Sequence, residues 1–479
     1  MLTACGAHLP PPLSRRESPW REMIYNRFRG LPAPLLCFPD GIIPAASIWT
    51  GTRVWLDELR QCGLGPGDRI ACALPPGPAF VMLLLAALWE GYTLIPLPPA
   101  EAKEDTLVAL DVRVLVGNQK GAGIRYDRDN MPESALSECP LRDTRTPRTP
   151  SVQLIARSSG TSGPGRWVAV SVEGLLSVLN SHSPLLGLDG ARVLSVLPWH
   201  HLFGLVIELL PALFAGAEVI RAAHNGRSTE ELLQLGLEHE ITHLSGVPLT
   251  FLRLIESPEG KALIARLDGG VVGGAPITSL LARHLSGTRL RVGYGQTEAS
   301  PGIALGEVGS FFPGCLGSPV GCEVRITSER LLEFKGDNAC LGYWVDGGLL
   351  PEKSEWRSSG DLAQWTPNGL RFIGRADDCF KLANGRMVTP SLIEERLRTL
   401  THSSGFFWVF SRDSVRLSLF HDGRFEHPLC ESFIEDAFSG MAGLCTEVTQ
   451  HLPDFFIATN KGDLNRRAMF ARLASDVCS

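Results

Sequence analysis

Short apolar runs alternate with helical segments from residue 69 to residue 294, and this alternation limits the possible folds more than any other feature. Residues 69–74 predict a buried strand, residues 79–89 a helix and residues 93–97 a second strand. Five further strand-like runs follow, at residues 193–197, 217–220, 242–247, 270–273 and 290–293. The pattern predicts an α/β fold of mostly parallel sheets covered by helices, with ligands at the carboxyl ends of the strands.

The pattern changes in the last third of the chain. Short strands with frequent glycine turns predict a β-rich subdomain at about residues 300–375. Beyond Arg375, one helical segment and two apolar runs predict a small, mobile C-terminal α+β domain over residues 376–479. Those three segments are residues 392–400, 406–410 and 415–420. The N-terminal end is rich in proline, serine and arginine, which predicts an irregular leader over residues 1–20 and a large N-terminal domain over residues 21–375.

Composition excludes several classes of function. The chain has 45 basic and 51 acidic residues and a formal net charge of −6, so no basic surface for nucleic acid is expected. Its longest strongly apolar run, residues 80–89, is too short to cross a bilayer. Twelve cysteines are scattered without a C-x-x-C pair, which indicates reduced thiols and a cytoplasmic location. A small-molecule partner is the expectation.

Small and hydroxyl residues follow the apolar run at residues 153–156. Glycine lets backbone N–H groups approach an anion, hydroxyls add donors, and Arg166 supplies a permanent charge. The sequence therefore predicts a phosphate-binding loop, although a serine- and glycine-rich stretch is also typical of a linker. The G-K-[ST] ending of a Walker loop is absent. The candidate contacts are Ser158, Ser159, Gly160, Thr161, Ser162, Gly163 and Arg166.

Four motifs together resemble those of one superfamily. Residues 158–166 are similar to its loop S-S-G-T-T-G-x-P-K-G, and residues 293–298 to its G-Y-G-x-T-E. Residues 359–362 read S-G-D-L, and residues 374–394 resemble its segment G-R-x-D-D-x-x-K-x-x-G-x-x-V-x-P-x-x-I-E. The order matches that of the adenylate-forming ligases: acyl-CoA synthetases, aryl and acyl acid ligases, luciferases and peptide-synthetase adenylation domains. The resemblance extends from about residue 59 to residue 467.

The resemblance implies a set of nucleotide contacts. Tyr294 would stack on adenine beside Gly295, Thr297 would contact the α-phosphate, and Glu298 would bind Mg²⁺, which prefers hard oxygen ligands. Asp361 would hold the ribose hydroxyls. Further implied contacts to the nucleotide are Arg375, Gly274, Ala275 and Lys381. Taken alone, Glu298 or Asp361 would more commonly be a helix cap or a solvated turn residue.

The resemblance also implies a hinge and an acid pocket. Asp377 would be the pivot on which the small domain turns, so that the segment around Lys381 faces the site and admits a pantetheine arm. The acid pocket would be formed by Trp199, His201, Phe203 and Gly273. His201 could equally be a hydrogen-bonded core residue, and Trp199 and Phe203 could belong to the core. No aspartate lies in residues 200–204, which disfavours an amino acid substrate.

The sequence departs from the family pattern at three positions. Arg166 stands where lysine is usual, and Trp167 where glycine is usual. Near the C-terminus the family has a G-K-x-x-R segment whose lysine stabilises the carboxylate and α-phosphate, and this chain has Asp463 at that position. A shift of two residues would bring Lys461 into register instead. A carboxylate beside an anionic phosphate is repulsive, so adenylation efficiency is in question.

Two functions follow from these observations. The first is ATP- and Mg²⁺-dependent activation of an aryl or fatty carboxylic acid as acyl-AMP, with pyrophosphate release and transfer to a thiol. That thiol would belong to CoA or to the pantetheine of an acyl carrier protein. The alternative is a half-active or non-catalytic protein that binds nucleotide or acyl-adenylate and is impaired in adenylation by Asp463.

Overall fold

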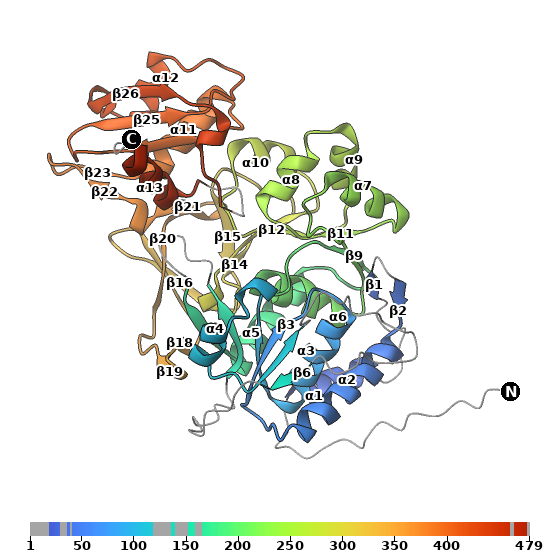
Figure 1. Cartoon of the computed structure of the whole chain (residues 1–479). Coiled ribbons are helices and arrows are strands. Elements are labelled where there is room, and N and C mark those ends of the chain that lie inside the picture. The colour runs from blue at the N-terminus through green and yellow to red at the C-terminus, as the bar shows by residue number, and fades with distance from the viewer. Residues whose placement is uncertain are drawn as a thin grey trace.

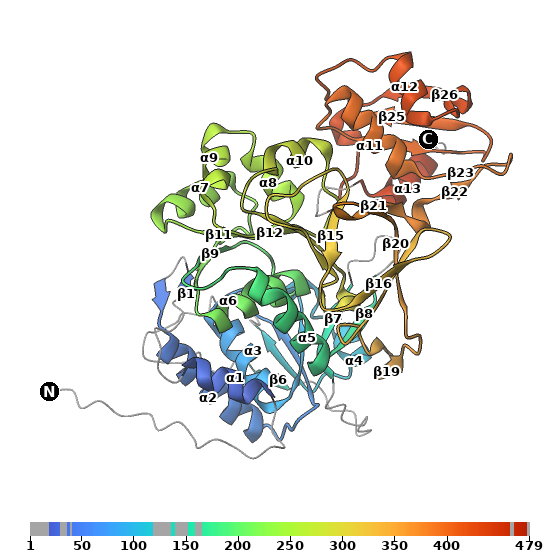
Figure 2. The same cartoon turned by 180° about the vertical axis from the view of Figure 1, so that it is seen from behind.

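The computed structural model describes residues 19–28, 36–38, 41–117, 136–138, 152–158, 165–459 and 464–476. The large part is built on three sheets. Figures 1 and 2 show a small C-terminal part, orange to red, stacked on one end of it. The predicted α/β architecture is confirmed. Within the described residues, none of the helices combines the length and the apolar character that a membrane crossing requires.

The first sheet has the strand order β19-β18-β8-β7-β4-β3-β5-β6. Its central strands are parallel, as the sequence predicts. Helices α2 and α3 pack against each other beside it, and the residues of α3 from Pro78 to Trp89 are all buried. The strands are β3 (Arg69–Ala73), β4 (Thr93–Pro96), β5 (Val114–Gly117), β6 (Leu136–Glu138), β7 (Val152–Arg157), β8 (Trp167–Ser171), β18 (Gly342–Val345) and β19 (Gly348–Pro351). The helices are α1 (Pro19–Phe28), α2 (Ala45–Gln61), α3 (Pro78–Glu90), α4 (Glu104–Ala109) and α5 (Val172–His182).

The second sheet has the order β11-β9-β10-β1-β2 and is parallel except for β2. The helical segments that follow its strands β9, β10 and β11 in the sequence are green in Figure 1. The strands are β1 (Leu36–Phe38), β2 (Gly41–Ile43), β9 (Arg192–Ser195), β10 (Glu218–Arg221) and β11 (His243–Leu244). The helical elements are the π-helix η3 (Phe203–Leu209), α6 (Leu210–Ala215), α7 (Thr229–Glu238), α8 (Pro248–Leu254), α9 (Pro258–Arg266) and α10 (Ser279–Leu285).

The third sheet has the order β12-β13-β14-β15-β21-β20-β17-β16 and contains most of the predicted β-rich region. Only its first pair, β12 and β13, is parallel. The strands are β12 (Val271–Gly273), β13 (Arg291–Tyr294), β14 (Ala304–Leu305), β15 (Cys315–Pro319), β16 (Glu323–Ile326), β17 (Leu331–Lys335), β20 (Arg357–Thr366) and β21 (Gly369–Arg375). The hairpin β18–β19 lies within the same sequence region but extends the first sheet, because β18 pairs with β8.

The predicted leader is too long at its C-terminal end. Helix α1 begins at Pro19, and the side chain of Trp20 is fully buried. Its Nε1 donates to Oε1 of Gln153 at 3.1 Å, and its ring stacks on Phe214. Trp20 is therefore part of the core, next to the strand that enters the phosphate loop. Residues 1–18 lie outside the described residues.

The C-terminal part has its own hydrophobic cores around β24, β25 and α11. Its elements follow the predicted helix and apolar runs to within two residues at each end, while the domain limits themselves stay a prediction. They are β22 (Phe380–Lys381), β23 (Met387–Val388), α11 (Pro390–Thr401), β24 (Phe407–Phe410), β25 (Leu417–His421), α12 (Glu431–Phe438), β26 (Cys445–Gln450) and α13 (Arg466–Asp476).

One buried ion cluster fixes the start of α13. Arg466 makes two hydrogen bonds to the carboxylate of Glu394, at 2.9 and 2.6 Å, and its Nε lies 3.3 Å from Oδ2 of Asp378. Burial raises the pKa of Asp378, and the charge of Arg466 partly offsets this effect. Removing one partner of such a cluster leaves buried charge uncompensated.

Replacing Arg466 with methionine is therefore expected to lower the free energy of unfolding by about 3–5 kcal/mol. The matched control is Arg396→Ala, because Arg396 forms a 2.6 Å ion pair with Asp436 in the same part of the chain but both side chains are about half exposed. Breaking that exposed pair should cost less than about 1 kcal/mol. Urea unfolding measures both values, and equal losses would contradict a special role for the buried cluster.

Candidate active site

A cleft of about 3420 Å³ separates the large part from the C-terminal part. The carboxyl ends of β7, β9, β12 and β13 open into it, as expected for parallel strands. The structure brings most of the predicted site residues together on its walls: Ser158, Arg166, His201, Phe203, Gly273, Gly274, Ala275, Tyr294, Gly295, Thr297, Glu298, Asp361, Arg375 and Asp377. The predicted contacts Ser159, Gly160, Thr161, Ser162, Gly163 and Lys461, together with Asp463, lie outside the described residues.

The two ends of the phosphate loop are held together. The backbone N–H of Ser158 donates to the carbonyl of Arg166 at 2.8 Å, and the N–H of Arg166 donates to Oγ of Ser158 at 3.1 Å. Gly165 lies against this closure, since a Cβ there would fall 2.1 Å from the carbonyl oxygen of Ser158. The loop thus leaves and re-enters the β7–β8 hairpin at fixed points.

Arg166 lies between an aromatic ring and a carboxylate. Its guanidinium carbon is 4.1 Å from the centroid of the Tyr343 ring, and its Nη2 is 3.7 Å from Oε1 of Glu298. Glu298 lies in the short helix η4 (Thr297–Ala299), which is separated from Tyr294 and Gly295 by Gln296 alone. The carboxylate of Glu298 at the cleft wall suits Mg²⁺, which commonly takes one or two carboxylates together with substrate phosphates.

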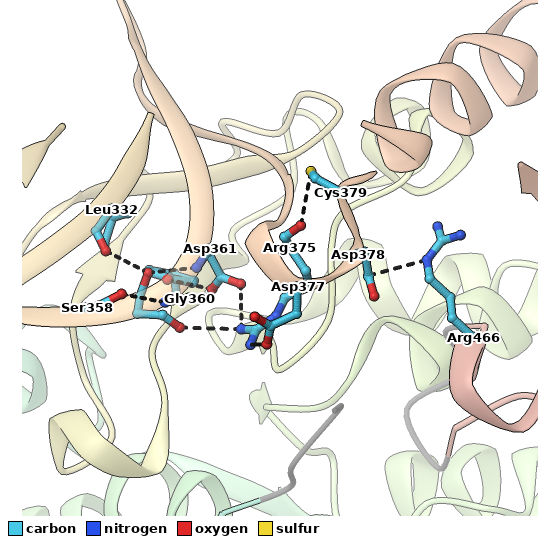
Figure 3. A network of polar contacts seen from close by, with 11 residues as sticks. Leu332, Ser358, Gly360, Asp361, Arg375, Asp377, Asp378, Cys379 and Arg466 are labelled. Atoms are coloured by element: carbon cyan, nitrogen blue, oxygen red, sulfur yellow. Dashed lines mark hydrogen bonds and ion pairs between the residues drawn. The ribbon is translucent and has the colours of Figure 1, made fainter. Parts of the chain in front are cut away.

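Asp361 lies at the centre of a buried polar group (Figure 3). The hydroxyl of Tyr294 donates to its Oδ2 at 2.7 Å, and Nη1 of Arg375 donates to its Oδ1 at 2.8 Å. Oγ of Ser359 accepts from its backbone N–H at 3.1 Å. Burial, together with the charge of Asp361, raises the pKa of Tyr294. The phenol therefore stays protonated and keeps the carboxylate oriented.

The hinge segment continues from this group. Nη2 of Arg375 lies 3.7 Å from Oδ2 of Asp377, which is on the first turn after β21. Burial lowers the pKa of Arg375, but the opposite charges of Asp361 and Asp377 outweigh it and leave the pKa raised. The guanidinium thus bridges the large part and the predicted pivot (Figure 3).

The aromatic residues of the predicted acid pocket divide into two groups. Phe203 lines the cleft opposite Gly273, where a Cβ would lie 3.5 Å from the ring of Phe203. His200 and His201 also line the cleft, with ring centroids 4.4 Å apart. Burial lowers the pKa of His200. The sequence did not predict His200 as a pocket residue, because the family motif places the pocket histidine at the neighbouring position, His201.

The predicted pocket role of Trp199 is wrong. Its side chain is fully buried, and its Nε1 donates to Oγ of Ser195 at 3.1 Å. Arg221 lies over the indole ring at 5.1 Å and donates to the carbonyl of Leu197 at 2.7 Å. Trp199 therefore belongs to the core beneath the pocket, which is the alternative that the sequence left open.

Lys381 does not reach the cleft in this arrangement. It is exposed on β22 and is absent from the described residues that line the cleft. Because it belongs to the C-terminal part, a different orientation of that part is needed to bring it to the nucleotide. Its contact role stays a prediction for that orientation.

One cluster of potential metal ligands lies outside the cleft lining among the described residues: Cys37, Glu218 and His239. Sγ of Cys37 donates to Oε1 of Glu218 at 3.1 Å. Burial and this carboxylate raise the pKa of Cys37 to about 12, so the thiol holds its proton. Since metals bind thiolate, the group is better described as a hydrogen-bonded pair with a nearby histidine.

Comparison with known proteins identifies the family of this chain. The family profile of AMP-binding enzymes matches residues 57–344. The chain belongs to the family of AMP-binding enzymes. A feruloyl-CoA synthase from an Amycolatopsis species is 27% identical over 372 residues, which cover 71% of this chain and 74% of that protein. A human long-chain-fatty-acid–CoA ligase is 31% identical over 161 residues, which cover 30% of this chain and 23% of the ligase.

Solved structures show the same fold. The anthranilate CoA ligase AuaEII in complex with anthranoyl-AMP has a TM-score of 0.74 at 17% identity, covering 95% of this chain and 98% of that chain. Escherichia coli MenE with bound OSB-AMS has a TM-score of 0.69 at 19% identity, covering 92% and 97%. The assignment to the adenylate-forming superfamily and to the AMP-forming acid–thiol ligases is therefore confirmed. The family profile is that of enzymes, and the relatives named above are a synthase and a ligase. These matches give no support to the non-catalytic alternative.

Replacing Asp361 with alanine is expected to weaken ATP and AMP binding alike, because both nucleotides carry the ribose diol. The expected loss is about 1.5–3 kcal/mol, as for hydrogen bonds to a charged group. Calorimetry on both nucleotides measures it, and Asp361→Asn controls for shape. Unchanged affinity for both nucleotides would show that this carboxylate does not hold the ribose.

Proposed function

We propose that this enzyme activates an aryl carboxylic acid with ATP and transfers the acyl group to the thiol of coenzyme A. The observation that carries the proposal is the oriented carboxylate of Asp361, fixed by Tyr294 and Arg375 at the wall of a cleft whose phosphate loop and Glu298 lie nearby. An aryl acid is favoured over a fatty acid because the match to the feruloyl-CoA synthase spans 71% of the chain, against 30% for the human fatty-acid ligase. A carrier-protein thiol is the alternative acceptor.

The first step is attack by a carboxylate oxygen of the acid on the α-phosphorus of ATP. A new phosphorus–oxygen bond forms, the bond to the β-phosphate oxygen breaks, and pyrophosphate leaves with the electron pair. Such a reaction needs positioning and charge neutralisation more than proton transfer. Thr297 and Arg166 supply a hydroxyl and a guanidinium on the side of the cleft where Glu298 lies.

Glu298 is the residue that would hold Mg²⁺, whose chemistry is to neutralise charge on the phosphates. In this structure Arg166 lies beside Glu298, so the phosphates must draw the guanidinium toward themselves when ATP binds. The side chain of Arg166 is 64% exposed, and exposed ion pairs contribute little free energy. The rearrangement therefore costs little.

The C-terminal part presents its terminal segment to the cleft. Ala458 and Leu464 form an antiparallel bridge, and both line the cleft. The N–H of Asn465 donates to the carbonyl of Ile457 at 2.7 Å, which strengthens the same closure. The described residues on both sides of 460–463 therefore line the cleft, which supports an orientation for adenylation.

The first test of the proposal is ATP–pyrophosphate exchange against a panel of aryl and fatty acids, followed by thiol capture with coenzyme A or a carrier protein. Glu298→Gln should abolish magnesium-dependent exchange while the fold stays intact, because the change removes a ligand charge at nearly constant volume. Circular dichroism is the control for folding. Undiminished exchange in this variant at ordinary magnesium concentration would refute the role of Glu298.

The second test concerns the anomaly at position 463. Asp463→Lys should raise the exchange rate, by about tenfold for each 1.4 kcal/mol of transition-state stabilisation recovered. Transfer from preformed acyl-adenylate to the thiol should hardly change, because by family resemblance that step uses another domain orientation. If Lys461 supplies the cation instead, Lys461→Ala lowers exchange and Asp463→Lys has little effect. Unaltered rates for both variants in both half-reactions would exclude this segment from the chemistry.

A further inference from the structure

A buried histidine outside the family motifs borders the acid side of the cleft. His182 is the last residue of α5, and only 2% of its surface is exposed. It lines the cleft together with Phe203, Ile207, Pro301 and Gly302. Two of these residues contact predicted site residues: Phe203 faces Gly273 of the predicted acid pocket, and the carbonyl of Pro301 lies against Gly295 of the predicted nucleotide contacts.

The hydrogen bonds around His182 define which ring nitrogen carries the proton. Oγ of Ser181 lies 2.9 Å from Nδ1 of His182, and the same hydroxyl donates its proton to the carbonyl of Ser177 at 2.7 Å. Because the serine proton is already used, its oxygen accepts from Nδ1–H. Nε2 then carries a lone pair and acts as an acceptor. Burial lowers the pKa of His182 to about 4, so the ring is neutral at physiological pH.

That acceptor is buried and lacks a hydrogen-bond partner among the described residues. Such an atom costs free energy unless a ligand or water supplies a donor. The unmet requirement of Nε2 is therefore specific: it needs a hydrogen-bond donor, and a carboxylate cannot provide one.

Gly302 packs closely against the edge of this imidazole. A Cβ at position 302 would lie 2.5 Å from Nε2, so any other side chain would meet the acceptor directly. The Gly302 backbone is fixed, because its carbonyl accepts from Nδ2 of Asn338 at 2.7 Å and Oγ of Ser300 donates to the carbonyl of Asn338 at 2.7 Å. Buried polar contacts of this kind hold a binding position within a narrow range.

We propose that Nε2 of His182 accepts a hydrogen bond from a hydroxyl group on the ring of the acid substrate, so that His182 selects hydroxyaryl acids over their deoxy analogues. This inference rests on the proposed function and deepens it by naming the substrate class. The two kinds of substrate should differ in binding free energy, because a substrate without the hydroxyl leaves the buried acceptor unpaired, whereas a substrate with the hydroxyl donates to it. Phe203 and Ile207 contribute apolar surface beside the aromatic ring.

The experiment compares matched pairs of acids in the exchange assay. Each pair consists of a benzoic or cinnamic acid with a ring hydroxyl at the meta or para position and the same acid without it. The wild-type enzyme is expected to favour at least one hydroxylated member by about tenfold or more in kcat/KM. Equal values within every pair would mean that only water occupies the position beside Nε2, and would overturn the inference.

Two variants locate the preference at His182. His182→Phe keeps an aromatic ring but removes the acceptor, so the ratio within the preferred pair should fall to about one. His182→Gln returns an acceptor oxygen and should restore part of the ratio. A merely structural role would lower activity toward both members of a pair equally, which would contradict the inference, as would a preference that survives in His182→Phe.

The matched control is His243→Phe. His243 is also a buried histidine with a pKa lowered by burial, but its Nε2 is 3.2 Å from the carbonyl of Leu186 and it does not line the cleft. This variant should lose stability and keep the wild-type ratio. The outcomes separate the two proposals: exchange without discrimination overturns the role of His182 alone, whereas the absence of exchange with every acid overturns the proposed function and this inference with it.

Discussion

The guanidinium of Arg375 is the contact on which the arrangement of the cleft depends. Arg375 and Asp361 are cross-strand partners on β21 and β20, so the register of the third sheet sets their pairing. The same guanidinium reaches Asp377 on the turn that begins the C-terminal part. The next residue, Asp378, contacts Arg466 at the start of α13. A run of two ion-pair groups, joined through the adjacent residues Asp377 and Asp378, therefore links the predicted ribose carboxylate to the terminal helix (Figure 3).

Under the proposed function, this run would couple the position of the small part to nucleotide binding. A ribose that bonds to Asp361 competes with Arg375 for the same carboxylate oxygens, and Asp377 lies within reach of the guanidinium as an alternative partner. A further contact between the two parts is made where Oε1 of Glu395 accepts from the N–H of Ser279 at 3.0 Å. Reorientation of the small part must break this bond, so its occupancy helps to define the present orientation.

The elements that the sequence predicts well are those with local causes. The alternation of apolar runs placed β3, α3, β4 and β9 to within about two residues, because each run is buried as one unit. The motif residues also came together, since Tyr294 and Glu298 are close in sequence and Asp361 pairs with Arg375 in a hairpin. Long-range packing was not predictable: β18 joins β8 across the sequence and brings Tyr343 to Arg166. His182 depends in the same way on Gly302, far along the chain.

The substitution of arginine for the usual lysine in the phosphate loop fits the surroundings that the fold creates. A planar guanidinium can lie over the Tyr343 ring while keeping donors free at its edge, whereas a lysine ammonium is a compact, strongly hydrated charge. Tyr343 reaches this position only because β18 extends the first sheet. The ion pair with Glu298, at 3.7 Å and largely exposed on the arginine side, is weak enough to break when phosphate arrives. The ring can then hold Arg166 near the loop, which limits the entropy lost on binding and makes the departure from the family pattern compatible with triphosphate recognition.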